Sequence, residues 1–383
     1  MKTVIYKEYE PSSVLNVHKN VDGGWFWDKY SAFPYMGCYY GCEYCYWRDE
    51  KYNRLAKEPE AAGLDDPFSQ YIKIKRNAAD SLRKSLVNKP REIIYLDSYQ
   101  PIESKYRLAR KMLEVCADMN FPVFINEKSP LLLKDLEVLT KIGRESYLNV
   151  GFSIVFSEDE RAKKTFESYT PTISSRFEAM KRLSNEGIIV GTVFMPILPF
   201  ISDTDENVKA IVRKTKDAGG SYVLDGGLTL RGYCGTRFYR FLREYDESLV
   251  PKYERLYSDQ KVLGKHYASS HELVKKYCRK YGLENHIKRP MNFYPKEIQT
   301  NKKLAEYFYL KSREIMMTEG MGFKQFAFLR AAWTLDSLTE DVREIFEESG
   351  TKGLLKLKGI GKKMADKIID LLEARASGSQ CTL

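Results

Sequence analysis

The sequence predicts a mixed α/β protein: a partial (β/α)6 barrel of the TIM type, followed by a helical extension and a small helical module. Apolar runs of strand character alternate with amphipathic stretches between about residues 31 and 230. Strands that alternate with helices of about 10–15 residues favour a parallel sheet. After residue 230 the chain becomes rich in tyrosine and basic residues, and near its end a glycine turn separates two short apolar faces.

The expected elements follow from these patterns. Candidate strands lie at residues 32–35, 92–97, 122–126, 148–155, 188–195 and 222–230. Candidate helices lie between them, at about 68–87, 103–119, 131–142, 158–186 and 205–218. The site of such a barrel lies at the carboxyl ends of its strands. The expected domains are an N-terminal extension (1–30), the barrel (31–230), a basic helical extension (231–334), a hairpin module (335–375) and a tail (376–383).

Composition excludes several classes of protein. Hydrophobic residues make up 43% of the 383 residues and charged residues 30%, which is typical of a soluble globular protein. No run approaches the roughly 20 apolar residues of a membrane span, and the N-terminus lacks the apolar core of a signal peptide. Seven cysteines, three of them clustered, favour a reducing compartment and a metal or catalytic site. We therefore expect a cytoplasmic protein with no membrane partner, and the oligomeric state stays open.

The clustered cysteines follow the first expected strand. Cys38, Cys42 and Cys45 have the spacing C-x3-C-x2-C, and three thiolates on so short a loop can ligate three of the four irons of a cubane iron–sulfur cluster. Gly37 and Gly41 would let the backbone pass close to such a bulky body. One alternative is zinc, but a closed structural zinc site needs four ligands, and no fourth Cys or His follows the motif. A second alternative is three unrelated core thiols.

This motif, placed after the first strand of a partial barrel, resembles the signature of the radical S-adenosylmethionine (SAM) superfamily. Residues 35–46, 97–103 and 195–199 are similar to the spore photoproduct lyase-like branch, often labelled DNA repair photolyase-like, and the resemblance covers roughly residues 15–250. It implies a [4Fe–4S] cluster whose fourth iron is chelated by SAM. One electron would cleave SAM to methionine and a 5′-deoxyadenosyl radical that abstracts hydrogen from the substrate. An electron donor such as a flavodoxin or ferredoxin is also implied.

The resemblance also implies which residues of this chain would form the SAM site, because they occupy matching positions. Tyr44 and Tyr46 flank the last cysteine as in the family. Lys128 matches the lysine expected near the SAM carboxylate, where it would give a charge-assisted contact, and Ser153 matches a polar SAM contact. Asp97 and Ser98 end the second strand, where family members contact the SAM amino group or ribose. Further candidates are Arg176 and Pro196. The alternatives are ordinary ones: Lys128 as a solvated strand end and Ser153 as a half-buried strand serine.

One departure from the family concerns the hydrogen donor that closes the catalytic cycle of spore photoproduct lyase. That donor is a cysteine on the second barrel strand, where this sequence has Tyr95 and Leu96. Repair of thymine dimers is therefore in doubt. Tyr44, Tyr46 and Tyr95 could relay a hydrogen atom, although tyrosines also simply pack around clusters. Cys116 lies in an amphipathic stretch typical of the core, which leaves Cys234 as the cysteine to test as a donor.

A second motif lies near the C-terminal end. Gly359 and Gly361 make a tight turn that exposes backbone N–H groups at the start of a helix, a ready site for a phosphate, and Lys362 and Lys363 follow. The pattern resembles a helix-hairpin-helix motif, which implies binding to the backbone of nucleic acid. The alternative is a helical hairpin used for packing or protein contact. Residues 231–290 carry a charge of +7 and residues 351–375 a charge of +4, out of +10 for the chain.

The two motifs together predict a radical SAM enzyme that acts on DNA or RNA, in lesion repair or nucleotide modification. A second hypothesis keeps the enzyme but gives it a peptide, protein or small metabolite as substrate, with the hairpin used for protein contact. A third is a non-enzymatic, metal-stabilised nucleic-acid-binding protein. The sequence does not identify the atom attacked, the reductant, or whether SAM is consumed.

Overall fold

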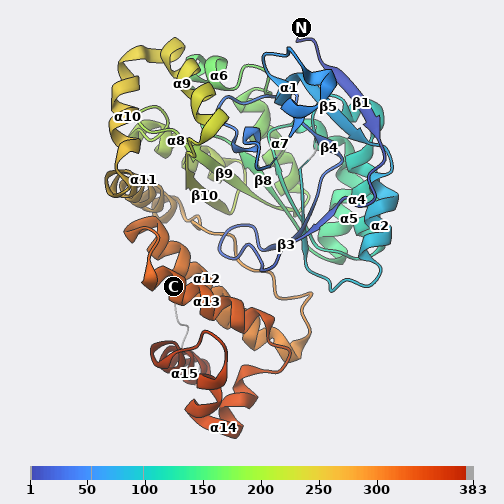
Figure 1. Cartoon of the computed structure of the whole chain (residues 1–383). Coiled ribbons are helices and arrows are strands. Elements are labelled where there is room, and N and C mark those ends of the chain that lie inside the picture. The colour runs from blue at the N-terminus through green and yellow to red at the C-terminus, as the bar shows by residue number, and fades with distance from the viewer. Residues whose placement is uncertain (1, 53, 98, 377–383) are drawn as a thin grey trace. The chain divides into compact units, whose positions relative to one another are not determined.

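A computed structural model describes residues 2–52, 54–97 and 99–376 (Figure 1). Its larger sheet has seven strands in the order β10-β9-β8-β7-β6-β3-β2, and the pairs from β6 to β10 are parallel. The prediction of a mixed α/β fold with a parallel sheet is confirmed. The strands are β2 (Leu15–Val17), β3 (Asp28–Ala32), β6 (Ile93–Leu96), β7 (Val123–Glu127), β8 (Leu148–Ser153), β9 (Ile189–Ile197) and β10 (Tyr222–Gly227).

The parallel strands are largely buried on both faces, so their sequences are mostly apolar and do not alternate regularly between apolar and polar residues. All six residues of β8 are buried. Leu96 of β6 pairs with Ile125 of β7, and Glu127 of β7 pairs with Phe152 of β8. Since neighbouring parallel strands end at the same edge of the sheet, this register places the residues after β6, β7 and β8 together.

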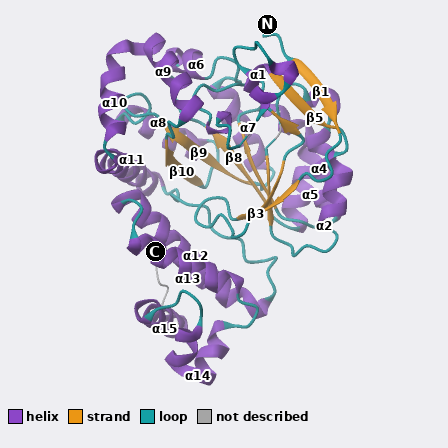
Figure 2. Ribbon diagram, in the orientation of Figure 1, coloured by secondary structure: helices purple, strands orange, loops and turns teal. Residues whose placement is uncertain are grey.

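Helices lie outside these strands (Figure 2). Two of them begin with threonine caps: Thr172 accepts a hydrogen bond from the Ser175 N–H, and Thr204 accepts one from the Asn207 N–H, each satisfying a donor that the helix leaves open. In the described part of the chain, no helix has both the length and the apolar character needed to cross a membrane. The helices are α2 (Ala78–Leu86), α4 (Leu108–Asp118), α5 (Leu136–Glu145), α7 (Ile173–Asn185) and α8 (Asp205–Asp217).

The single helix expected at 68–87 is wrong. A short helix α1 (Pro67–Gln70) is followed by strand β5 (Tyr71–Lys75), whose sequence YIKIK alternates with the period of a strand. β5 pairs in parallel with β1 (Ile5–Tyr9) and antiparallel with β4 (Tyr35–Met36) in a separate three-stranded sheet. The strand expected at 32–35 is also not found: β3 of the larger sheet ends at Ala32, and β4 of the smaller sheet begins at Tyr35.

Two further expected helices are each interrupted. The stretch 103–119 contains α3 (Glu103–Tyr106) and α4, separated by Arg107 in a left-handed conformation with φ of 54°. The Glu103 carboxylate accepts from the N–H groups of Leu108 and Ala109, which holds the start of α4 after this break. The stretch 158–186 contains α6 (Glu160–Phe166) and α7, because Pro171 and the cap Thr172 start a new helix.

The chain forms two compact units, and the division differs from the expected boundary at residue 230. The first unit comprises the residues up to His18 and Lys29–Asn285, and the second comprises Lys19–Asp28 and the chain from His286 onward. Residues 231–285 belong to the first unit because α11 packs on β10 and α8, and the Tyr253 hydroxyl donates to the Pro199 carbonyl over 2.6 Å. Their helices are α9 (Gly232–Asp246), α10 (Val250–Ser258) and α11 (Gln260–Tyr281).

In the residues that the structure describes, the second unit contains the segment 19–28, the segment 286–298 and four α-helices. The indole of Trp27 donates to the Ile287 carbonyl over 2.7 Å, and its ring meets that of Tyr309 edge-on. α14 is two helical pieces joined at Gly350, which has a φ of 58°. Most of the expected tail lies outside the described residues. The helices are α12 (Gln299–Glu319), α13 (Phe323–Ser337), α14 (Val342–Lys356) and α15 (Lys362–Ala376).

Candidate active site and nucleic-acid interface

The cysteine motif forms two consecutive tight turns after β4. The Gly41 N–H donates to the Cys38 carbonyl over 3.1 Å, and the Cys45 N–H donates to the Cys42 carbonyl over 3.1 Å. Cys42 is buried, whereas Cys38 and Cys45 are partly exposed. The turns therefore gather the three thiols on one short loop with two of them open to a ligand.

The two glycines of this loop are required by the protein itself. Gly37 has a φ of +86°, and a Cβ there would lie 2.7 Å from the carbonyl oxygen of Tyr71. Gly41 has a φ of +54°, and its Cβ would lie 2.7 Å from the Cβ of Ser69. The backbone thus passes close to the segment 68–71, a reason that differs from the expected approach to an inorganic body.

Gly37→Ala is expected to destabilise the first unit by more than about 2 kcal/mol, since an unfavourable positive φ is combined with a clash against fixed backbone. Gly63→Ala is the matched control, because Gly63 also has a positive φ, +80°, but nothing lies within 4 Å of its Cβ position. The control is expected to lose only about 1 kcal/mol. Urea unfolding measures both, and equal losses would contradict the role assigned to the clash.

Arg48 stabilises the cysteine loop through its backbone carbonyls. Its Nε donates to the Cys42 carbonyl over 2.9 Å, its Nη2 donates to the Gly41 carbonyl, and its Nη1 pairs with Asp66. Arg237 of α9 pairs in turn with Asp66 and Glu43. These four charged residues are buried, so the loop is fixed by an ion-pair network that sequence reasoning missed. The one signal for it was Glu43, an acid placed between two cysteines of the motif.

The three thiols influence one another electrostatically. Burial raises the pKa of Cys45 to about 12, and the neighbouring Cys42 adds to this rise. Burial also raises the pKa of Cys38, with Cys42 and Asp97 adding to it. Cysteines bind metals as thiolates, so a cation bound between these three would offset the rise in their pKa values.

The spacing of the sulfur atoms separates two kinds of metal site. In the described residues, no group of three or more Cys, His, Asp or Glu ligand atoms lying within 4.8 Å of one another contains these cysteines. A single zinc ion, with Zn–S bonds of about 2.3 Å, holds its sulfur ligands closer together than this. A cubane spreads three thiolates over three separate irons. At least one pair of the three sulfur atoms is therefore farther apart than a single zinc ion would hold it.

Lys128 lies at the centre of a polar cluster beside the cysteine loop. Its Nζ lies 2.6 Å from the Ser153 hydroxyl, 3.2 Å from the Tyr44 hydroxyl and 3.3 Å from a carboxylate oxygen of Glu167. The structure therefore brings together Lys128, Ser153 and Tyr44, which the sequence named separately. Their residues come from the end of β7, the end of β8 and the cysteine loop.

Glu167 is the partner that sequence reasoning missed. It is fully buried, and its carboxylate pairs with Arg176 and accepts from the Tyr44 hydroxyl. Burial alone would raise the pKa of Glu167, but Arg176 and Lys128 outweigh this and lower it. Arg176 is also fully buried and donates to the Ser153 carbonyl over 2.9 Å. Arg176 therefore contacts Ser153 and Glu167, and nothing in the local sequence distinguishes Glu167 from the other glutamates.

Two acidic residues, Asp97 and Glu127, lie at the ends of the neighbouring strands β6 and β7. Asp97, after β6, retains accessible surface, and its carboxyl is hydrogen-bonded to that of Glu127. Enclosure by protein atoms and the charge of Glu127 raise the pKa of Asp97. Glu127 in turn accepts from the Tyr99 N–H over 2.7 Å. The neighbouring candidate Ser98 lies outside the described residues.

The candidate hydrogen donors are placed differently from one another. The thiol of Cys234 is buried against the cysteine loop, with its Sγ 3.6 Å from the Cys45 carbonyl oxygen. Tyr46 is 47% exposed and packs edge-on against Tyr52. Tyr95 packs between Phe33 and Phe124, outside the polar cluster. A small cavity of about 60 Å³ next to this loop is lined by Tyr46, Asp49, Lys51, Tyr52, Thr229, Arg231 and Cys234.

Pro196 lies within β9, and the carbonyl of the preceding Met195 is 3.4 Å from the Ser153 hydroxyl. This segment therefore borders the polar cluster through its backbone. The role of Pro196 in cofactor binding remains a prediction, as do the roles of the other candidates named from the sequence.

The hairpin joins α14 to α15. Gly359 has a φ of +86°, as a tight turn requires, but Gly361 does not share this conformation and a Cβ there would meet open space. Gly361 instead begins the next helix, since its carbonyl accepts from the Ala365 N–H over 2.9 Å. The side chains of Lys362 and Lys363 are exposed, next to the open N–H groups of a helix start.

Residues 299–376 match a helix-hairpin-helix domain family. The chain is 28% identical over 236 residues to an uncharacterized protein of Mycobacterium tuberculosis, covering 60% of this chain and 67% of that protein. It is 29% identical over 199 residues to an uncharacterized protein of Methanocaldococcus jannaschii, covering 51% and 70%. A solved structure of spore photoproduct lyase complexed with dinucleoside spore photoproduct aligns with a TM-score of 0.46 at 14% identity, covering 70% of this chain and 78% of that chain. The C-terminal part of the chain, residues 299–376, is therefore similar to helix-hairpin-helix domains.

Proposed function

We propose that the protein is a radical SAM enzyme whose substrate is nucleic acid. The observation that carries the proposal is the convergence of the cysteine loop and the Lys128 cluster at one edge of the sheet, through the Tyr44 hydroxyl 3.2 Å from Lys128 Nζ. In the family that the motif resembles, these are the parts that hold the cluster and SAM.

The residues of this site fit both an iron–sulfur cluster and SAM. Three thiols on one short loop suit a [4Fe–4S] cluster, which in this position would supply the electron that cleaves SAM. Lys128 and Arg176 face a single carboxylate, Glu167, which leaves one positive charge to bind the SAM carboxylate. The acidic pair of Asp97 and Glu127 complements the two positive charges of SAM, its ammonium and its sulfonium.

The supporting residues have two tasks. Arg48 and its ion-pair network keep the cysteine loop in place, and Glu167 orients Tyr44 and Lys128 by binding both. The small cavity lined by Tyr46 and Cys234 adjoins the cysteine loop. Because Cys234 lies at its wall, we also propose Cys234, rather than Tyr95, as the residue to examine as hydrogen donor.

The choice of nucleic acid rests on the C-terminal unit. Its hairpin offers open N–H groups and exposed lysines to phosphate, and its sequence matches a helix-hairpin-helix family. A peptide or small metabolite is the second candidate substrate, favoured only by the modest size of the cavity.

Lys362→Glu is expected to weaken nucleic-acid binding at low salt by about tenfold or more, since a favourable phosphate contact becomes a repulsive one. The wild-type affinity should fall steeply as salt rises, and the variant should show a shallower slope. Fluorescence anisotropy with a labelled oligonucleotide measures both. Lys303→Glu on α12, also an exposed lysine of this unit, is the control and should change the affinity far less.

The substrate itself is identified by isotope transfer. Nucleic acids deuterated at chosen positions are incubated with the reduced holoenzyme and SAM, and 5′-deoxyadenosine is analysed by mass spectrometry. Deuterium in this product from a labelled nucleotide supports the proposed substrate class. Binding of nucleic acid without any transfer from a uniformly deuterated strand would contradict it and favour the second candidate.

A further inference from the structure

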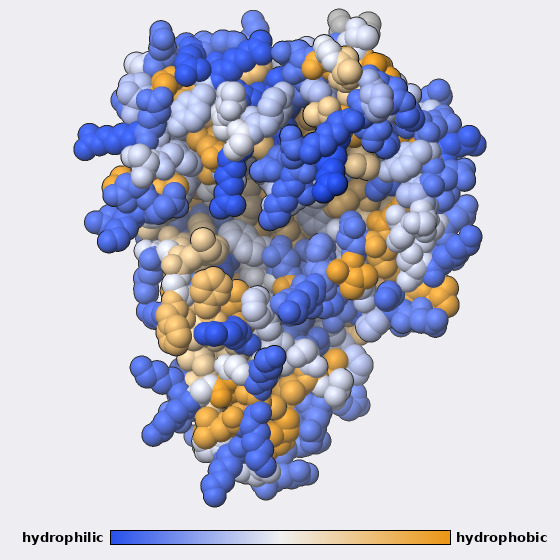
Figure 3. All heavy atoms as spheres, in the orientation of Figure 1, coloured by the Kyte–Doolittle hydropathy of each residue, from blue (hydrophilic) through white to orange (hydrophobic). Residues whose placement is uncertain are grey.

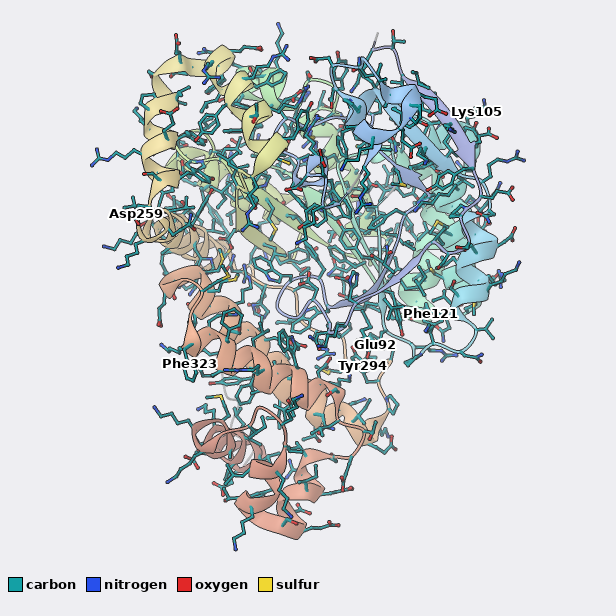
Figure 4. The ribbon with its side chains drawn as sticks, viewed as in Figure 1. Glu92, Lys105, Phe121, Asp259, Tyr294 and Phe323 are labelled. Atoms are coloured by element: carbon teal, nitrogen blue, oxygen red, sulfur yellow. The ribbon has the colours of Figure 1, made fainter. Side chains whose placement is uncertain are left out.

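The start of α13 carries two strongly exposed apolar side chains. Among the large apolar residues that the structure describes, Phe323 has the highest exposed fraction, 84%, and Met321 follows with 75%. Phe323 stands at the first turn of the helix (Figure 4), in a region where apolar side chains gather on the surface (Figure 3). Exposed apolar side chains that adjoin one another mark interaction sites more often than scattered ones do.

This exposed ring shares a helix face with the hairpin turn. Arg330 and Thr334 lie seven and eleven residues after Phe323, which places all three on one stripe of α13. The Arg330 guanidinium lies 5.9 Å from the Phe323 ring centroid. At the other end of the stripe, the Thr334 hydroxyl donates to the Lys358 carbonyl, and a Cβ on Gly359 would lie 3.5 Å from the Arg330 Cβ.

The charge of this face indicates the chemistry of its partner. Arg330, Lys358, Lys362 and Lys363 are exposed along the stripe and at the turn. α13 contains one acidic residue, Asp336, and that carboxylate pairs with Lys302 over 3.2 Å and with Arg289. A cationic surface that bears an exposed aromatic ring is the combination with which proteins bind unpaired nucleotides.

We propose that Phe323, with Met321 beside it, stacks on an unpaired base of a strand whose phosphates bind at the hairpin turn. The eleven residues from Phe323 to Thr334 span about 16 Å of helix, which corresponds to about five nucleotides of a strand whose bases stay stacked with the 3.4 Å rise of B-form DNA. The C-terminal unit therefore prefers single-stranded or gapped nucleic acid to an intact duplex. This inference rests on the proposed binding of nucleic acid by the hairpin.

The test compares a labelled 20-nucleotide oligothymidylate with a 20-base-pair duplex, using the full-length protein and fluorescence anisotropy at low salt. Phe323→Ala and Phe323→Leu should each weaken single-strand binding by about 5- to 150-fold, the range expected for one lost base stack. Phe323→Tyr, which keeps the aromatic face, should stay within twofold of the wild type. Duplex affinity should be unchanged in all three variants. At 84% exposure the side chain contributes little to folding, and circular dichroism checks that the fold is kept.

Several outcomes overturn the inference. If Phe323→Ala binds the single strand as tightly as the wild type does, Phe323 does not stack on a base. Equal losses for both probes mean that the ring is not reading unpaired bases. A Phe323→Leu protein that binds like the wild type indicates a general apolar contact, and a shift from dimer to monomer in Phe323→Ala indicates a second copy of the chain as the occupant. If Lys362→Glu leaves binding intact while Phe323→Ala weakens it, the hairpin proposal fails and the stacking contact stands.

Discussion

Arg176→Met is expected to lower the free energy of unfolding by about 3 kcal/mol. Arg176 and Glu167 are both fully buried and pair with each other, and removal of one partner leaves a buried charge uncompensated at a cost of about 3–5 kcal/mol. The lower end applies because Lys128 stays within 3.3 Å of Glu167. Methionine keeps most of the volume of the arginine side chain. Equilibrium urea unfolding followed by circular dichroism measures the change.

Two comparisons isolate the cause. Arg182→Met, at an exposed position on the same helix, should stay within about 0.5 kcal/mol of the wild type. The double variant Arg176→Met with Glu167→Gln should recover part of the loss, because it removes the unpaired charge. A single variant as stable as the wild type would show that this buried ion pair does not contribute to the stability of the first unit.

Cys42→Ala should abolish assembly of the iron–sulfur cluster. Cys42 is the most buried thiol of the loop, at 7% exposure, and lies next to Lys128, Glu167 and Arg176. With two thiolates left, a cubane has too few protein ligands to be held. After anaerobic reconstitution, the variant should be nearly colourless and low in iron and sulfide, whereas the wild type should be brown.

The matched control for this experiment is Cys116→Ala. Cys116 is a fully buried thiol of α4 that lies in the core of the first unit. The control protein should reconstitute like the wild type. A Cys42→Ala protein with a full content of iron and sulfide would contradict the assignment of the motif.

Much of the site could be predicted because it depends on strand ends. Lys128 and Ser153 follow neighbouring strands with apolar sequences that are easy to recognise, and parallel strands end at one edge. Glu167 could not be predicted in this way, since its contact with Tyr44 joins residues 123 positions apart. Long-range pairs between charged residues leave no local pattern in the sequence.

The three helix predictions that the structure contradicts failed for different physical reasons. Only some of these reasons could have been recognised in the sequence. Pro171 and Thr172 are ordinary signals for a helix start, so the break within 158–186 could have been predicted. The break at Arg107 could not, because a non-glycine residue in a left-handed conformation is held there by the Glu103 carboxylate. In β5, lysines alternate with apolar residues. This short strand pattern lies within a longer amphipathic stretch, and for that reason the sequence predicts a helix there.

The central claim is that the cysteine loop and the Lys128 cluster together cleave SAM. The most direct measurement uses the wild-type protein, reconstituted anaerobically with iron and sulfide, reduced with dithionite and supplied with SAM. The structure predicts that 5′-deoxyadenosine and methionine form in equal amounts and that Cys42→Ala forms neither. A brown, reduced wild-type protein with a full iron and sulfide content that forms no 5′-deoxyadenosine would contradict the claim.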